Sequence, residues 1–263
     1  AQIQTLLMLL RYYFDLLREV RNMLTFLNKL GITVTRSRNV DPERRMNVIL
    51  TRELPKVEAF IDVGANSGQT YYRVRSLGFK GLYVAIEPET TCYKKLKAQI
   101  VNDNLFSCLN FAVGESSADK ILHIASNDSL SSSILELSDL HTKAAPSITM
   151  ISTQSVRIET LSKLLMDVSA KSLLVKIDVQ GYELPVLKGI SENDWKRIEV
   201  LLLECNLVGT YQGSGLIEEV IAFLRKRGFH PYRIENGFGM PNFGQQLQVD
   251  VLFKRLTPED NAD

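Results

Sequence analysis

The sequence predicts an α/β fold: a doubly wound sheet preceded by an N-terminal helical extension. From Val57 onward, short apolar runs rich in Val, Ile, Phe and Leu alternate with segments of helical period, which is the pattern of a parallel sheet covered on both faces. The chain has 263 residues, of which 45% are hydrophobic, enough for one large core. We therefore divide it into a helix and connection (1–40), one α/β domain (41–257) and a tail (258–263).

The N-terminal extension is predicted to be a long amphipathic helix over residues 3–30. Its apolar residues alternate between spacings of three and four, and Gly31 follows as a stop signal; they are Ile3, Leu6, Leu10, Tyr13, Leu17, Val20, Leu24 and Leu27. Such a helix can dock on its own domain, pair with a second copy in a homodimer, or make a peripheral membrane contact. The apolar run 6–10 is too short to span a bilayer, so we expect a cytoplasmic protein that is at most membrane-peripheral.

Residues 32–47 are interpreted as a polar connection, and the α/β pattern follows it. The expected strands lie near 58–63, 81–86, 107–113, 173–179, 198–204, 229–234 and 248–254. The expected helices lie near 68–77, 89–101, 160–168, 181–189 and 215–227. Between 114 and 155 the pattern weakens into a Ser-rich stretch, which we interpret as a long insertion, either disordered or a lid over a site.

Charge and cysteine content exclude several classes of function. Lys and Arg number 31 against 30 Asp and Glu, so the chain has no general basic surface for a phosphate backbone, and we expect no nucleic-acid partner. The three cysteines form no CxxC pair and are odd in number, which favours buried free thiols over a disulfide framework. The three histidines lie far apart in the sequence and form no metal-binding signature.

A glycine turn after a buried strand is the most informative motif. Residues 60–70 have the sequence FIDVGANSGQT, in which Gly64 and Gly68 remove side chains where a ligand can approach the backbone. The helix that follows presents free N–H groups at its start. The GxxxG spacing differs from the GxGxxG of dinucleotide binders, which disfavours an NAD-dependent oxidoreductase. A tight turn without a ligand is the alternative interpretation.

Polar residues follow the next two strands. The strand 81–86 ends at Glu87 and Pro88, which places a carboxylate beside the glycine turn, where it suits the two hydroxyls of a ribose. The alternative is that Glu87 interacts with the dipole of the helix behind it. The third strand ends in Asn110, Ala112 and Val113, which can border an adenine, although an Asn at a strand end is commonly a turn former.

Three more carboxylates are predicted at the same edge of the sheet. The segment 175–189, VKIDVQGYELPVLKG, places Asp178 at a strand end and Glu183 on the first turn of a helix, where a capping role is the alternative. Glu204 closes the next strand, with Asn206 close behind it. Ligands of open α/β sheets bind beyond the carboxyl ends of the strands, so these residues are candidates for chemistry.

These motifs resemble the FkbM-type methyltransferases, a branch of the Rossmann-like S-adenosylmethionine-dependent enzymes. The resemblance covers roughly residues 55–255 and rests on DVGANSG (62–68), IEP (86–88), KIDVQGYE (176–183) followed by VLKG, and DVLF (250–253). The family often has Glu where Gln180 stands here, and Gln also occurs there in relatives. The resemblance implies a seven-stranded sheet with its last strand antiparallel, S-adenosylmethionine as methyl donor, and O-methylation of sugars, glycolipids or polyketide-type products.

The resemblance also implies where the cofactor lies. The glycine turn would hold its methionine part, Glu87 its ribose, and residues 110–113 its adenine side, while the serines at 131–133 can close over it and exclude water. The cofactor-binding candidates are Asp62, Gly64, Ala65, Asn66, Gly68, Gln69, Thr70, Glu87, Pro88, Asn110, Ala112, Val113 and Ser132.

Methylation of an alcohol requires that its oxygen lose a proton, which a carboxylate can accept. Asp178 is the first candidate, followed by Glu183 and Glu204, with His230 as a fourth. Alternatively, Asp178, Glu204 and Asn206 can hold a Mg²⁺ ion that lowers the pKa of the acceptor hydroxyl. A noncatalytic adapter that recruits partners through its N-terminal helix is the rival from another class. The acceptor is expected to contact segments 125–155, 206–215 and 235–247, which carry no readable code.

Overall fold

The computed structural model describes residues 42–241 and 244–255. The helix predicted over 3–30 and the tail 258–263 lie outside the described residues. The chain divides into two compact units, 1–45 and 46–263, and the second holds the sheet and all the candidate site residues. No helix within the described ranges is long and apolar enough to cross a membrane.

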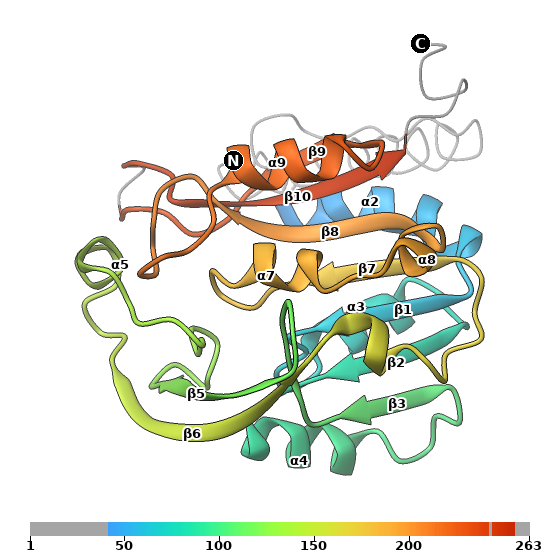
Figure 1. Ribbon diagram of the computed structural model, residues 1–263, viewed down its shortest axis with the longest axis horizontal. Coiled ribbons are helices and arrows are strands. Elements are labelled where there is room, and N and C mark those ends of the chain that lie inside the picture. Colours follow the sequence, from blue (N-terminus) through green and yellow to red (C-terminus); the bar gives the residue numbers. More distant parts are fainter. Residues whose placement is uncertain (1–41, 242–243, 256–263) are drawn as a thin grey trace, which may run out of the picture. The chain divides into compact units, whose positions relative to one another are not determined.

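A seven-stranded sheet organises the second unit, in the order β3-β2-β1-β7-β8-β10-β9 (Figure 1). Its strands are β1 (Ala59–Val63), β2 (Leu82–Ile86), β3 (Phe106–Leu109), β7 (Leu173–Ile177), β8 (Ile198–Asn206), β9 (Phe229–Asn236) and β10 (Gln248–Arg255). The pairs from β3 through to β8 are parallel, whereas β10 is antiparallel to both β8 and β9. The predicted doubly wound sheet with an antiparallel last strand is confirmed.

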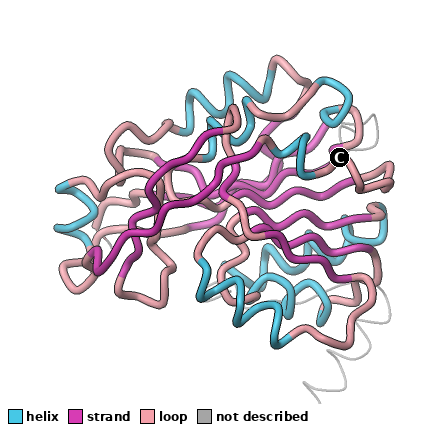
Figure 2. Tube along the Cα trace, turned by 60° about the horizontal axis from the view of Figure 1, so that its bottom comes forward, coloured by secondary structure: helices cyan, strands magenta, loops and turns pink. Residues whose placement is uncertain are grey.

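Helices cover both faces of this sheet (Figure 2). Alternate residues of β1 point to opposite faces, so Ile61 packs in one core and Phe60 in the other. Helices α6 (Leu161–Leu164), α7 (Glu183–Lys188), α8 (Glu192–Trp195) and α9 (Ile217–Arg225) contribute to the first core. Helices α3 (Gln69–Ser76) and α4 (Thr90–Gln99) contribute to the second.

Residues 42–53 form a helix, α2 (Pro42–Glu53), followed by a 3₁₀ turn, η1 (Leu54–Lys56). The interpretation of 32–47 as a connection is therefore wrong from Pro42 onward. Proline suits the first position of a helix, and Met46 and Leu50, one turn apart, are buried in the second core. Because arginines surround Met46 and Leu50, the sequence shows no clear helical pattern of apolar residues in this segment.

The insertion between β3 and β7 folds into a second, three-stranded sheet in the order β4-β6-β5. It comprises β4 (Ala112–Val113), β5 (Ala118–Ala125) and β6 (Met150–Glu159), with a short helix α5 (Asp139–Ala144) between the last two. The single strand expected over 107–113 is thus two strands in different sheets, and 118–125 and 150–159 are ordered strands. Their side chains are mostly exposed or half-buried, which explains why the sequence shows no apolar run there.

Candidate active site

The glycine turn joins β1 to α3 and needs its glycines for internal reasons. Gly64 and Gly68 have φ angles of 82° and 93°, a region that other residues rarely adopt. A Cβ at Gly64 would lie 1.9 Å from the carbonyl oxygen of Asp178, and one at Gly68 would lie 2.6 Å from Leu96 Cδ1. The close approach of the chain's own backbone and of helix α4 therefore explains why both positions are glycine, whether or not a ligand binds at this turn.

Glu87 lies against this turn, as the sequence predicts. Its Oε2 accepts a hydrogen bond from the Asn66 N–H at 2.7 Å, and its Oε1 accepts one from the Glu89 N–H at 2.8 Å. Burial raises the pKa of Glu87 to about 7, although both N–H bonds oppose the shift. Each carboxylate oxygen has two lone pairs, so this side chain can still accept from two ligand hydroxyls.

The carboxylate at the start of helix α4, the role considered for Glu87 as a partner of the helix dipole, is supplied by Glu89. The Glu89 carboxylate accepts from the N–H groups of Thr91 and Cys92 at the start of α4. Although burial opposes this, the N–H bonds hold the pKa of Glu89 below its usual value. Since another acid caps the helix, capping does not account for Glu87.

Asp62 lies in the core instead of at the turn. Its carboxylate is fully buried, accepts from the Tyr83 hydroxyl at 2.6 Å and lies 3.4 Å from Lys176 Nζ. Burial raises the pKa of Asp62, and Lys176 opposes that shift. Asp62 is on the same face of β1 as Phe60, so it reaches the cofactor region only through its neighbours.

The residues predicted for the adenine side are dispersed. Asn110 is exposed, and its amide donates to the main-chain oxygens of Glu87 and Pro88 at 2.8 and 3.0 Å. It thus ties the end of β3 to the end of β2. Ala112 and Val113 are buried in β4 of the second sheet. This arrangement gives Asn110 a turn-forming role whether or not a ligand binds beside it.

Gln180, which the sequence analysis did not propose as a site residue, links Asp178 to Glu204. The Gln180 amide Nε2 donates to Asp178 Oδ1 and to Glu204 Oε2, both at 2.9 Å. Lys176 Nζ lies 3.2 Å from Asp178 Oδ2. The Asp178 side chain is 34% exposed, so it remains accessible to a substrate.

Burial and charge distinguish the groups of this cluster. Burial raises the pKa of Glu204 well above its usual value, and the nearby Asp178 and Glu183 add to the effect. Burial opposes the charge of Lys176, but the carboxylates of Asp178 and Asp62 raise its pKa. Lys176 therefore stays cationic between its two partners, while Glu204 tends to keep its proton.

Two of the proposed bases have other positions. Glu183 is buried, and its Oε1 accepts from the N–H groups of Val179 and Gly181 at 3.1 and 3.0 Å, which shapes the turn before α7. His230 pairs in register with Lys254, which also pairs with Val200 near the start of β8. His230 therefore lies at the opposite edge of the sheet from Asp178, and its nomination as a base is wrong.

Asn206 has a satisfied carbonyl oxygen. Its Oδ1 accepts from the Thr210 hydroxyl and from Gln248 Nε2, while its Nδ2 has no partner among the described residues. Within the described part of the chain, no three His, Cys, Asp or Glu side chains are grouped as metal ligands.

The Ser-rich segment 126–133, predicted to be a lid, bonds to both halves of the site. Asn66 Nδ2 donates to the carbonyl oxygen of Asp128 at 3.1 Å, and Ser133 Oγ donates to that of Gln180 at 2.7 Å. Ser132 accepts from the Ala125 N–H and so holds the turn of its own segment. Residues on either side of Ser132 therefore tie this ordered segment to the glycine turn and to Gln180, and its role as a lid stays a prediction.

Tyr211, in the segment 206–215 that we expect to contact the acceptor, is the other residue of this cluster that the sequence analysis does not single out. It is buried, and its hydroxyl lies 2.6 Å from Gln180 Oε1 and 3.2 Å from the carbonyl oxygen of Ser131. Nothing local in the sequence signals this contact, because its partners lie 31 and 80 residues away. The only signal is that Gln180 lies inside the KIDVQGYE motif (176–183), which carries part of the family resemblance.

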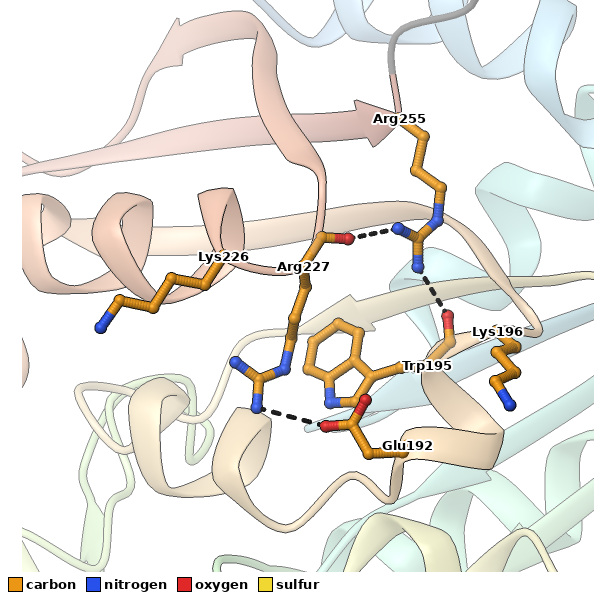
Figure 3. A pocket seen from close by; sticks show the side chains of 6 residues that line it. All are labelled: Glu192, Trp195, Lys196, Lys226, Arg227 and Arg255. Carbon is orange, nitrogen blue, oxygen red and sulfur yellow. Dashed lines mark hydrogen bonds and ion pairs between the residues drawn. The ribbon is translucent and has the colours of Figure 1, made fainter.

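A pocket at the opposite edge of the sheet is lined by none of the candidate site residues (Figure 3). It is lined by Glu192, Trp195, Lys196, Lys226, Arg227 and Arg255. The Arg255 guanidinium donates to the main-chain oxygens of Arg227 and Trp195, and Arg227 pairs with Glu192. The side chains of Lys196 and Lys226 extend in different directions (Figure 3). Its two arginines thus make contacts within the fold.

Comparison with known proteins identifies the family. The family model described as the methyltransferase FkbM domain matches residues 62–231, more than half of the chain. Methyltransferase sdnD of Sordaria araneosa is 26% identical over 199 residues, which are 67% of this chain and 75% of that protein.

Solved structures resemble the chain more distantly. A precorrin-6y C5,15-methyltransferase from Geobacter metallireducens has a TM-score of 0.43 at 10% identity, covering 85% of this chain and 93% of that chain. An rRNA methylase from Streptococcus thermophilus has a TM-score of 0.45 at 10% identity, covering 83% and 98%. On the strength of the family match, the chain belongs to the FkbM family and is an S-adenosylmethionine-dependent methyltransferase.

Proposed function

We propose that the enzyme methylates a hydroxyl oxygen of a sugar, glycolipid or polyketide-type acceptor, with Asp178 as the base. The observation that carries this proposal is the Asp178 carboxylate itself. It follows the carboxyl end of β7, remains partly exposed, and is oriented by Lys176 and Gln180. In open α/β sheets, ligands bind at this edge.

The residues present fit S-adenosylmethionine at the glycine turn. Glu87 keeps lone pairs available for the ribose hydroxyls. Helix α3 begins at Gln69 without a side-chain cap from the described residues, so the N–H groups of Gln69 and Thr70 can receive the carboxylate of the cofactor. Asp62 acts on this region indirectly, because it fixes Lys176, which in turn holds Asp178.

The reaction needs little more than alignment and a proton acceptor. S-adenosylmethionine supplies a methyl group on a sulfonium, whose sulfur keeps the electron pair of the broken C–S bond. Asp178 accepts the proton of the acceptor hydroxyl as its oxygen bonds to the methyl carbon. Lys176 and Gln180 fix the direction of that carboxylate, and segment 126–133 excludes water. Alignment of this kind can lower the barrier by roughly 7–11 kcal/mol.

Calorimetry with S-adenosylmethionine tests the cofactor site. We expect binding by the wild type and about 10- to 150-fold weaker binding by Glu87→Gln, since a hydrogen bond to a charged group contributes ~1.5–3 kcal/mol. Glu199→Gln, an exposed glutamate at the start of β8, is the matched control. An unchanged affinity in Glu87→Gln would show that the ribose site is misplaced.

Transfer of a labelled methyl group to a panel of hydroxyl-bearing sugars, glycolipids and polyols tests the chemistry. Asp178→Asn should bind the cofactor normally and lose about 10²–10⁴-fold in transfer rate, the usual contribution of a positioned base. Full transfer activity in Asp178→Asn would remove Asp178 as the base. Transfer only to nitrogen or carbon acceptors would overturn the assignment of a hydroxyl.

A further inference from the structure

The side chain of Gln180 is unusually well fixed for a surface-edge glutamine. Both of its polar atoms are engaged: Nε2 with Asp178 and Glu204, and Oε1 with Tyr211. Its backbone adopts φ 58°, a left-handed conformation that costs a non-glycine residue about 1–3 kcal/mol. Its carbonyl oxygen accepts from Ser133. The fold thus holds this one residue from the β7 edge, the β8 edge and the insertion.

The orientation of the carboxamide follows from its partners. The Tyr211 hydroxyl can donate to Oε1, which leaves the NH₂ group to face the two carboxylates. The flipped amide would place its carbonyl oxygen against Asp178 and Glu204, where oxygen would meet oxygen. Only one orientation therefore satisfies all three partners.

Asp178 and Glu204 direct one oxygen each at the same point, and hydrogen-bond donors, a positive group or a proton can satisfy such a pair. A divalent cation is a common solution, because Mg²⁺ and Ca²⁺ prefer carboxylate oxygens. Here the two N–H bonds of Gln180 fill that point, each at 2.9 Å. A glutamate at position 180 would instead bring a third carboxylate to the same place.

We propose that Gln180 is a positioning residue that takes the place of a divalent cation between Asp178 and Glu204. It holds the Asp178 carboxylate toward the acceptor without a metal ion, and Tyr211 holds Gln180 in turn. The identity of residue 180 then determines whether Asp178 and Glu204 can bind a cation between them. This inference rests on the proposed function only for the role of Asp178 as base.

The test compares cation binding by the wild type, Gln180→Glu and the control Gln99→Glu, which changes an exposed glutamine of α4. Each protein is dialysed against a chelator and then titrated with Mn²⁺ and Mg²⁺, followed by calorimetry and thermal unfolding. We expect no saturable binding by the wild type or by Gln99→Glu. Gln180→Glu should bind one ion and gain about 3–6 °C in Tm at millimolar cation.

Two outcomes overturn the inference. One is saturable cation binding by the wild type that Asp178→Asn abolishes. The other is a folded Gln180→Glu that binds no ion. If Gln180→Glu does not fold, two other measurements test the inference. The wild type must bind no ion. Gln180→Leu must bind the cofactor with unchanged affinity but lose methyl transfer. Failure of the wild type to bind S-adenosylmethionine would instead contradict the assigned cofactor site. The cation-binding comparison would still test the role of Gln180, because it does not depend on the cofactor.

Discussion

Replacement of Glu183 by Gln should stabilise the protein at alkaline pH. Glu183 is 3% exposed, and its Oε1 accepts from Val179 and Gly181. A glutamine carbonyl can accept the same two bonds, so the substitution removes the charge and keeps the geometry. Burial raises the pKa of Glu183 to about 7, compared with 4.5 for an ordinary glutamate.

The sign and size of the effect follow from that pKa. A carboxyl with a raised pKa binds its proton more tightly in the folded state, so its favourable contribution is complete below pH 4.5 and is lost as the pH rises through 7. A difference of about 2.5 pKa units corresponds to ~3 kcal/mol. Glu183→Gln should therefore gain about 3 kcal/mol relative to wild type between pH 4 and pH 9. An unpaired glutamine NH₂ would offset about 1 kcal/mol of this at every pH.

Urea unfolding at pH 4, 6, 7.5 and 9 measures this gain. Glu218→Gln, an exposed glutamate of α9, controls for the loss of one negative charge. Cofactor affinity should be the same in wild type and Glu183→Gln, because Glu183 shapes a turn and touches no ligand in the proposed site. An equal stability difference at all four pH values, or a loss of cofactor binding in a stable variant, would refute the reasoning.

Three further changes have definite outcomes. Gly64→Ala should destabilise the protein by more than about 3 kcal/mol in urea unfolding, since its Cβ would lie 1.9 Å from the Asp178 carbonyl oxygen; a variant as stable as wild type would contradict the turn geometry. Tyr83→Phe should cost about 1–3 kcal/mol, because it leaves a buried Asp62 oxygen without its hydroxyl donor, and combination with Asp62→Asn should recover part of that cost. Removal of residues 1–30 should lower the number of copies per particle in solution if that segment pairs two copies. An unchanged oligomeric state would mean that the segment docks on its own domain or contacts a membrane.

The sequence predicts the large sheet well because most of its strands, namely β1, β2, β7, β8 and β10, are apolar runs that are largely buried on both faces. The same criterion misses β5 and β6, since strands in a small, mostly exposed sheet carry no such run. It also misses helix α2, in which the apolar residues Met46 and Leu50 are buried but stand among arginines. What sequence periodicity detects is burial, and elements with little burial escape it.

The site divides in the same way. Glu87 and Asp178 could be placed because the ends of parallel strands share one edge, and their positions need no knowledge of side-chain contacts. The face of β1 that Asp62 occupies could not be predicted from the motif, and the structure places its carboxylate in the core beside Tyr83. Gln180 and Tyr211 could not be joined from the sequence, since the folding of a distant loop and of the insertion brings them together.

The buried pair of Asp62 and Lys176 constrains how this sequence can change over evolutionary time. The two residues lie in motifs more than a hundred positions apart, and both are almost wholly removed from solvent. Loss of Lys176 alone would leave the Asp62 charge in the core without its cation, at a cost of about 3–5 kcal/mol, whereas joint replacement by apolar residues can be neutral. Loss of Asp62 alone leaves Lys176 paired with Asp178. The constraint on positions 62 and 176 therefore runs in one direction: a homologue that lacks the lysine at position 176 should also lack the acid at position 62.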